Sequence, residues 1–370
     1  MPALCTVFAT RRAAPSVDAL AAAAGGAEVE LCGAEGAAWE AVTFRWPGLE
    51  LTVRRMGAES ERLREQREAL RGFLLHCARG APPSPRAAAL LAKAAWTQQV
   101  FGVVAEPGPE AGRSDPLVRA LAEAVYGVVL RDGRLFDPAL RLLLAPGGES
   151  DPQAEVPYSP AARERKRRIE ERMERAGLGR PPDLPPLPGE DEAAPRPASE
   201  IAARAQALFA VAAKAEGLAD HEQATALLRE RGLWEAATPA ERAFLEREAP
   251  SAVERQRFAA RREALAALLW ALGHLPSLPA PTLPARMEGL VGVLRRSSAV
   301  EFVARAELGP LPALLDAADL SYRCHGLVAL AARAGQEPPG GLLPDVVRER
   351  HAAFFWSLRI QEGGWDRLAD

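Results

Sequence analysis

The sequence predicts an α+β protein of two domains: an N-terminal mixed α/β sandwich-like domain over residues 1–145 and a C-terminal all-α globular helical domain over residues 199–370. Up to residue 145 the apolar residues switch between a period of two and a helical period, whereas after residue 199 the period is helical throughout. Residues 146–198 are rich in proline, glycine and acids, which predicts a linker with one charged helix. A chain of 370 residues is long enough for two hydrophobic cores.

The N-terminal domain is predicted to alternate strands and helices. Residues 41–46 and 49–55 alternate apolar and polar side chains on either side of Pro47-Gly48, which predicts a β-hairpin. Asp132-Gly133 predicts a second hairpin, because this dipeptide favours a tight two-residue turn. The other expected elements are strands at 4–9, 28–31 and 100–105 and helices at 17–24, 59–80, 84–99 and 116–124.

The linker contains one segment of high helical propensity, residues 161–177, in which arginines and glutamates are interleaved. Its local basic excess is compatible with a nucleic-acid-binding arm. The interleaved glutamates favour a different interpretation, a solvated helix that docks through a narrow apolar edge formed by Ile169 and Met173, one turn apart.

The C-terminal domain is predicted to be entirely helical. Three helix starts carry a capping box, in which a hydroxyl residue precedes a glutamate by three positions. These boxes are Thr238 with Glu241, Ser251 with Glu254, and Ser298 with Glu301. The expected helices are 200–216, 221–231, 239–248, 252–272, 285–295, 299–307, 312–334 and 344–360.

The charge balance argues against nucleic acid and membranes as partners. The chain has 46 lysines and arginines against 49 acids, a formal charge of -3, so no global field attracts an anionic surface. Lysine occurs only at Lys93, Lys166 and Lys214, which indicates a codon bias toward arginine rather than a phosphate-binding surface. We therefore expect the partner to be a protein or a small ligand.

The cysteines and the apolar runs bear on the compartment. Cys5, Cys32, Cys77 and Cys324 are scattered without C-x-x-C spacing, which predicts reduced thiols, no metal site and no cofactor. The N-terminus places its arginines after its short apolar run, the reverse of an export signal, and no run approaches the roughly 18 apolar residues of a membrane span. These features predict a soluble cytoplasmic protein.

One helical segment, "DLSYRCHGL" at residues 319–327, is unusually rich in reactive side chains. At about 100° per residue, Asp319 and Arg323 share one side of the helix, whereas Tyr322 and His325 fall on the apolar stripe and are expected to face the core. The next expected helix places His351 on its own apolar stripe. The short loop between these helices predicts that they are neighbours, so His325 and His351 are expected to approach each other.

Further polar residues on these helices predict burial. Glu263 and Trp270 lie on an alanine-lined side of their helix, so the Glu263 carboxylate needs a partner, for which Arg323 and Arg350 are the candidates. The residues expected in a binding site or a buried polar network are Glu263, Trp270, Asp319, Arg323, Glu349, Arg350 and Trp356.

Six segments in order, among them "RREALAALLWALGHL", "DAADLSYRCHGLVA" and "PDVVRERHAAFFW", resemble the bacterial domain of unknown function 4272 family. The resemblance covers about residues 163–370. It departs at Gly326, where the family pattern usually has tryptophan, and at Phe355, where it usually has asparagine. The resemblance implies a helical fold and no particular reaction.

Three interpretations of the polar residues remain open. The first is structural: a buried ion network with two hydrogen-bonded core histidines. The second is a non-enzymatic binding or regulatory module, which by analogy with other bacterial multidomain proteins would act in defence or in immunity against toxins. The third is a hydrolase-type enzyme in which His325 and His351 act as acid and base or as metal ligands, with Tyr322 as donor.

Overall fold

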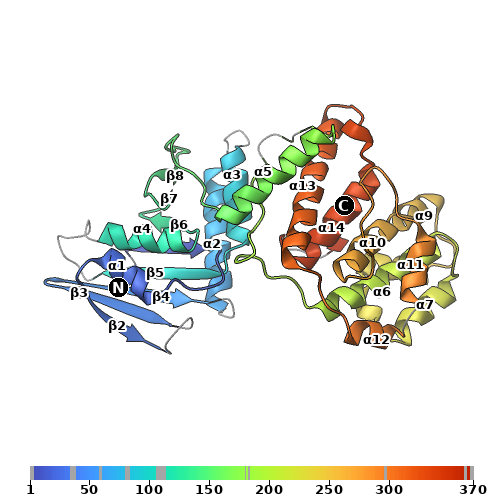
Figure 1. Ribbon diagram of the computed structural model, residues 1–370, viewed down its shortest axis with the longest axis horizontal. Coiled ribbons are helices and arrows are strands. Elements are labelled where there is room, and N and C mark those ends of the chain that lie inside the picture. The colour runs from blue at the N-terminus through green and yellow to red at the C-terminus, as the bar shows by residue number, and fades with distance from the viewer. Residues whose placement is uncertain are drawn as a thin grey trace. The chain divides into compact units, whose positions relative to one another are not determined.

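The computed structural model describes residues 4–33, 39–57, 61–79, 84–105, 114–179, 181, 184–295, 298–361 and 365–366. The chain forms two compact units (Figure 1). One comprises residues 1–163 with 191–193, and the other comprises residues 164–190 with 194–370. Residues 146–198, the predicted linker, are thus distributed over both units.

The first unit is built on one antiparallel sheet of eight strands in the order β2-β3-β4-β5-β1-β6-β7-β8. Both predicted hairpins are present, β3–β4 around Pro47-Gly48 and β6–β7 around Asp132-Gly133. Asp132 and Gly133 adopt φ values of 48° and 67°, as a tight hairpin turn requires. The strands are β1 (Cys5–Ala9), β2 (Glu28–Cys32), β3 (Ala41–Trp46), β4 (Leu49–Met56), β5 (Gln99–Ala105), β6 (Val128–Arg131), β7 (Arg134–Phe136) and β8 (Leu142–Leu144).

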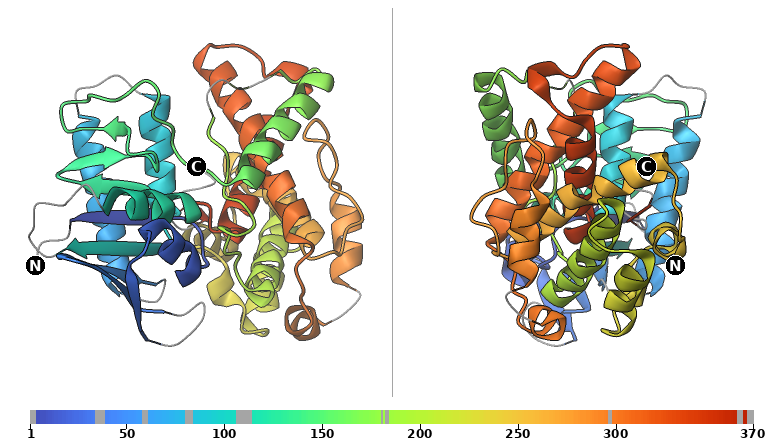
Figure 2. Two further views of the ribbon diagram at one scale, coloured as in Figure 1. Left: turned by 60° about the vertical axis from the view of Figure 1, so that its left-hand side comes forward. Right: turned by 90° about the vertical axis from the view of Figure 1, so that its right-hand side faces the viewer.

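Helices cover both faces of this sheet (Figures 1 and 2). Helices α1 (Val17–Ala24) and α4 (Asp115–Ala124) bury their apolar sides on one face. Helices α2 (Glu61–Cys77) and α3 (Pro85–Ala95) do so on the other. The three layers confirm the predicted mixed α/β class, with one sheet between two layers of helices.

The returning segment Asp191–Ala193 is anchored in the first unit by buried polar groups. Thr10 donates to the Glu192 carboxylate at 2.5 Å, and the Lys93 ammonium donates to the Thr10 hydroxyl at 3.0 Å. All three side chains are buried. Burial lowers the pKa of Lys93 to about 8, an effect that the nearby Glu192 carboxylate opposes.

The second unit is helical, as predicted. The one substantial difference is that residues 252–272, expected as a single helix, form two helices that meet at Ala260. The break lets Phe258 stack on Phe244 at 4.2 Å while Arg261 reaches Glu241. The helices are α5 (Pro160–Arg175), α6 (Ala198–Ala215), α7 (His221–Arg229), α8 (Pro239–Glu246), α9 (Ala252–Ala259), α10 (Arg261–Ala271), α11 (Met287–Leu294), α12 (Ala299–Ala304), α13 (Leu311–Arg333) and α14 (Pro344–Ser357).

The three predicted capping boxes are confirmed. Thr238, Ser251 and Ser298 each accept from the backbone N–H three residues on, and the glutamate there accepts from the backbone of the capping residue. A fourth box, Asp220 with Gln223, begins α7 and was not predicted.

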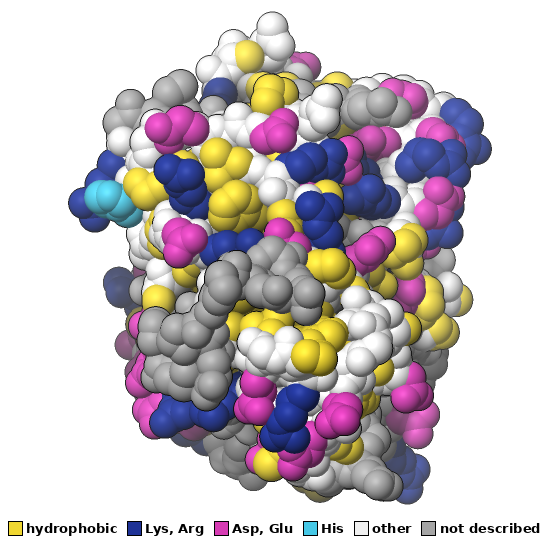
Figure 3. All heavy atoms as spheres, turned by 90° about the vertical axis from the view of Figure 1, so that its left-hand side faces the viewer, with side chains coloured by type: hydrophobic (Ala, Val, Ile, Leu, Met, Phe, Trp, Pro, Cys, Tyr) yellow, Lys and Arg dark blue, Asp and Glu magenta, His cyan; other side chains and the backbone are white. Residues whose placement is uncertain are grey.

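The surface mixes both signs of charge. On the face of the molecule in Figure 3, basic and acidic side chains are interspersed over the visible part. Three of the four free cysteines are buried, as expected, and Cys32 is exposed. None of the helices in the described part of the chain has the length and apolar composition needed to cross a bilayer.

Candidate functional site

Helix α5 docks on α13 through the predicted apolar edge. Ile169 and Met173 are buried and pack with Cys324 and Leu327 of α13. Most other side chains of α5 are charged, and Arg167 pairs with glutamates of its own helix at the exposed surface. This docking places the polar side of α5 next to the side of α13 that carries Asp319 and Arg323.

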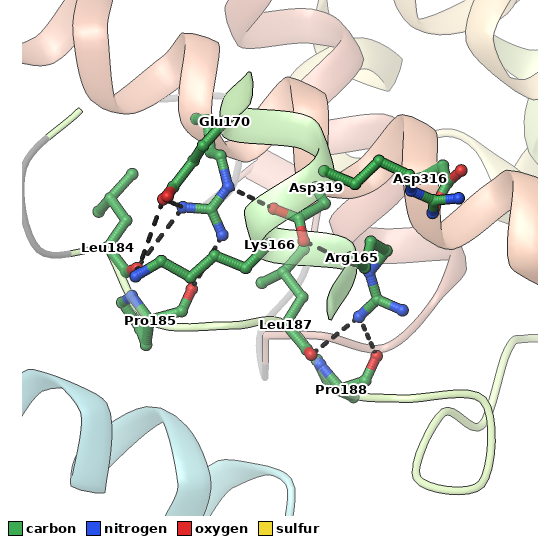
Figure 4. Close-up of polar contacts among 11 residues, drawn as sticks. Arg165, Lys166, Glu170, Leu184, Pro185, Leu187, Pro188, Asp316 and Asp319 are labelled. Carbon is green, nitrogen blue, oxygen red and sulfur yellow. Dashed lines mark hydrogen bonds and ion pairs between the residues drawn. The ribbon is translucent and has the colours of Figure 1, made fainter. Parts of the chain in front are cut away.

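Asp319 lies at the centre of a buried ion cluster, which we call the aspartate cluster: Asp319, Arg165, Arg323 and Glu170 (Figure 4). Its carboxylate lies 3.3 Å from Nε of Arg165 and 2.7 Å from Nε of Arg323. Arg323 also donates to Glu170 at 2.8 Å. Asp319 and Arg323 are 0% exposed, so their side of α13 is buried at least as deeply as its apolar stripe.

The same cationic groups hold a proline-rich segment, residues 184–188, by its backbone carbonyls (Figure 4). Arg165 donates to the carbonyls of Leu187 at 2.9 Å and Pro188 at 2.5 Å. Lys166 donates to the carbonyl of Leu184 at 2.7 Å. Arg323 donates to the carbonyls of Leu184 at 3.5 Å and Pro185 at 3.4 Å, so four carbonyls of five consecutive residues are bound.

The sequence of this segment explains the mode of binding. Proline has no backbone N–H, so in "LPPLP", with its three prolines, the carbonyls are the main polar groups of the backbone that a partner can bind. Leu187 is 1% exposed and anchors the segment. Leu184 lies against α13 at Gly326, where an added Cβ would come within 2.6 Å of Cδ1 of Leu184. At this position the resemblance leads one to expect tryptophan, which the present arrangement has no room for.

Glu349 belongs to a second buried ion chain. Arg261 donates to both oxygens of Glu349, at 2.7 and 2.9 Å, and to Glu241 at 3.1 Å. Glu241 in turn receives two hydrogen bonds from Arg204. The guanidiniums of Arg204 and Arg261 lower the pKa of Glu241, against the effect of its burial.

Glu263 and Arg350 form a third, separate pair. Of the two candidate partners of Glu263, it is Arg350 that donates to it, at 2.9 Å, while Arg323 belongs to the aspartate cluster. Glu263 also accepts from the backbone N–H of Ala285 at 2.7 Å. The five charged residues expected in one network therefore fall into three clusters.

The tryptophans lie outside these clusters. Trp270 is half-buried and meets Phe354 edge-on at 5.9 Å between ring centroids. Trp356, also half-buried, lies under the Arg196 guanidinium at 4.6 Å and against Trp365 at 5.4 Å. Each makes packing contacts rather than the polar contacts that were expected of it.

His325 and His351 do approach each other. Their rings are parallel within 4° and their centroids are 4.3 Å apart. His351 is buried and also contacts Phe355 at 3.9 Å and Tyr322 at 6.1 Å. Tyr322 and His325 are only half-buried, although their place on the apolar stripe predicts core positions. Nδ1 of His351 has no hydrogen-bond partner among the residues that the structure describes.

The environment of these rings favours their neutral forms. Burial lowers the pKa of His325, and the charge of Arg348 adds to the effect. Burial lowers the pKa of His351 well below its ordinary value, with a further contribution from His325. Burial also raises the pKa of Tyr322 and of Cys324 to about 12, so both stay protonated at neutral pH.

The parallel stacking of His325 and His351 limits the chemistry that the two rings can perform. A metal ion bound by two imidazoles lies in the plane of both rings, and parallel stacked rings share no such point. In the described part of the chain, no group of three histidine, cysteine, aspartate or glutamate side chains has the geometry to hold a metal ion. The phenol of Tyr322 and the thiol of Cys324 are not activated as nucleophiles.

Several site residues escaped the sequence analysis. Arg165, Lys166 and Glu170 lie in a segment assigned to the linker, and Arg204 and Arg261 lie on helices with no distinguishing motif. Glu241 was identified only as a capping residue, because its second role depends on two arginines far away in the sequence. The interleaved charges of α5 were the one local signal.

Searches of curated proteins and of solved structures gave no match to this chain. Residues 165–368 match the family described as Domain of unknown function (DUF4272). The matched region contains the three ion clusters, the histidine pair and the proline-rich segment. The match confirms the resemblance seen in the helical segments, and the chain belongs to the DUF4272 family.

Proposed function

We propose that the helical unit is a non-enzymatic binding module whose ligand is an extended, proline-rich peptide segment. In this chain the module holds its own residues 184–188, which gives it a regulatory character. The observation that carries the proposal is the set of hydrogen bonds from Arg165, Lys166 and Arg323 to four carbonyls of that segment.

The chemistry suits such a ligand. A hydrogen bond from a charged donor contributes about 1.5–3 kcal/mol, more than one between neutral groups. Arginine can bind two acceptors at once through its planar fork, as Arg165 does. Proline fixes φ, so a proline-rich segment loses little backbone entropy when it is held. Asp319 keeps Arg165 and Arg323 in place through their Nε atoms, so Nη2 of each arginine donates to carbonyls of the segment, while Nη1 of Arg323 is shared between Glu170 and Leu184.

The hydrolase alternative has less support. It relies on His325 and His351 as acid and base with Tyr322 as donor. These rings contact one another by their faces. In the described part of the chain, no carboxylate forms a hydrogen bond or ion pair with either imidazole, so nothing orients it as a general base.

The cellular setting is also a proposal. We place the module in the bacterial cytoplasm, with a protein partner that presents a proline-rich segment, in a regulatory role such as defence or immunity against toxins. The near balance of 46 basic and 49 acidic residues supports a protein partner over nucleic acid or a membrane.

Binding of an added peptide tests the proposal. The full chain with Leu187→Ser, which weakens the internal segment, is titrated into a fluorescein-labelled peptide of residues 183–190, and anisotropy is followed. We expect saturable binding to the Leu187→Ser chain. Binding to the unmodified chain should be weaker, because its own residues 184–188 already occupy the site. A second substitution, Arg165→Gln, should weaken binding about tenfold or more, since it removes two charged donors.

The matched control is Arg167→Gln on the same helix, which pairs only with exposed glutamates and should leave peptide binding unchanged. Circular dichroism checks that each variant is folded. If the folded Leu187→Ser chain does not bind the peptide, or if Arg165→Gln and Arg167→Gln behave alike, the proposal is wrong.

A further inference from the structure

The histidine pair, His325 and His351, joins α13 to α14 at one point. The two rings stack face to face at 4.3 Å, and Phe355 of α14 covers His351 at 3.9 Å. His351 is 6% exposed and its Nδ1 has no hydrogen-bond partner among the described residues. The contact therefore depends on ring packing between neutral imidazoles, and among the described residues no carboxylate forms an ion pair with either ring.

The charges that face the pair would all oppose protonation or are already neutralised. On α14, Arg348 acts on His325 as a like charge. On α5 and α14, Arg172 and Arg350 act on the neighbouring Cys324 and add positive charge. The buried carboxylates on the elements around the pair are each held by an arginine: Asp319 on α13, Glu170 on α5, Glu263 on α10 and Glu349 on α14.

His325 of the pair lies within the stretch of α13 that holds the proline-rich segment. Arg323, two residues before His325, donates to the carbonyls of Leu184 and Pro185. Gly326, the residue after His325, contacts the side chain of Leu184. A change in how α13 packs on α14 at His325 is thus transmitted through one helical turn to two contacts of the segment.

We infer that the histidine pair is a proton-operated latch on the site that binds the proline-rich segment. Protonation separates the stacked rings, shifts this turn of α13 and releases the segment. The inference rests on the proposed binding function and adds its regulation. The lowered pKa of both histidines fits it, because each proton that enters the pair opposes the closed arrangement. The segment is therefore bound at neutral pH and released at acidic pH.

The pH dependence of peptide affinity tests the latch. Affinity of the labelled 183–190 peptide for the Leu187→Ser chain is measured between pH 7.5 and 5.5. We expect it to fall about tenfold, because pH 5.5 lies one unit below the ordinary histidine pKa of 6.5 that the open state would have, while burial keeps the pKa of His351 well below that value in the closed state. Adding His351→Phe, which keeps an aromatic ring but removes the more deeply buried of the two proton sites, should make the affinity clearly less dependent on pH. His221→Gln, at the start of α7, is the control and should leave the dependence intact.

A second measurement keeps the test independent of added peptide. Exchange of the Leu187 amide hydrogen, corrected for its intrinsic rate, is followed by NMR in the ¹⁵N-leucine-labelled full chain. Protection of this amide should decrease as the pH is lowered in the unmodified chain, and should decrease less in His351→Phe. Peptide binding without pH dependence would overturn the latch and leave the binding function standing. Absence of peptide binding at every pH would overturn the binding function, and the Leu187 exchange would then decide on the latch alone.

Discussion

Two polar clusters on neighbouring sides of α13 balance charge in opposite ways. In the aspartate cluster every buried charge faces a counter-charge, with Asp319 between two arginines and Arg323 between two carboxylates. In the histidine pair, two titratable rings lie together, and no carboxylate of the described residues forms an ion pair with them. Counter-charges hold the aspartate cluster together, although burial raises the pKa of Asp319 against the effect of Arg323 and Arg165, whereas the histidine pair can gain a proton only without such a counter-charge. The two clusters are only one turn apart, so the second can act on what the first holds in place.

The largest expected effect comes from breaking the balanced cluster. Asp319→Ala leaves Arg165 and Arg323 without their shared carboxylate, and loss of one partner of a buried ion pair costs about 3–5 kcal/mol. Urea unfolding followed by circular dichroism would measure it. Asp316→Ala, on the same helix, is the matched control, because its pair with Arg168 is partly exposed and should contribute less than about 1 kcal/mol. Equal effects of the two substitutions would contradict the burial of the cluster.

The next effect concerns the anchor of the proline-rich segment. Leu187→Ala removes most of a side chain that is 1% exposed, and truncation of a buried leucine costs about 2–5 kcal/mol. Because the segment is held at one side of the unit, we expect a loss of stability toward the lower end of this range. Leu343→Ala, at a leucine that is 36% exposed, is the control. A loss no larger than that of the control would show that the segment is not packed as described.

A smaller effect on the free energy of unfolding is expected from the histidine pair. The pKa of both imidazoles is lower in the folded chain than the ordinary 6.5, so the unfolded chain binds more protons under mild acid. The stability that depends on the neutral pair is therefore complete above pH 6.5 and is lost as pH falls below it, by about 1.4 kcal/mol for each unit of pKa difference.

Unfolding midpoints at pH 7.5 and 5.5 would measure this loss. His351→Phe should lose less stability between these two pH values than the unmodified chain does. His221→Gln should lose as much as the unmodified chain. A pH dependence that survives His351→Phe unchanged would place its origin in groups other than His351.

Local features of the fold could be predicted from the sequence, and long-range partners could not. Pro47-Gly48, Asp132-Gly133 and the three capping boxes depend on a few consecutive residues, and all of them form as expected. Strand β8 was not expected, because three leucines in a row have no alternation to distinguish them.

The residues of the candidate site also divide into those with local signals in the sequence and those whose partners are distant in it. The approach of His325 and His351 follows from two apolar stripes and a short loop, which are local, and it was predicted. A buried ion network that includes Asp319 and Arg323 was also among the interpretations, but their partners Arg165 and Glu170 were not predicted, because α5 lies in a segment that composition alone assigns to a linker. A polar face on a helix indicates solvent only when no other charged segment of the chain covers it.

The smallest expected effect is that of Tyr322→Phe, which shows what kind of contact holds the histidine pair together. The Tyr322 ring packs on His351 and Phe355, and its hydroxyl makes no hydrogen bond within the described part of the chain. Removing that hydroxyl should change stability by less than about 0.5 kcal/mol and leave the pH dependence of unfolding unchanged. If Tyr322→Phe instead abolished the pH dependence, the phenol would be exchanging protons with the imidazoles, and the acid-base alternative would gain the support it now lacks.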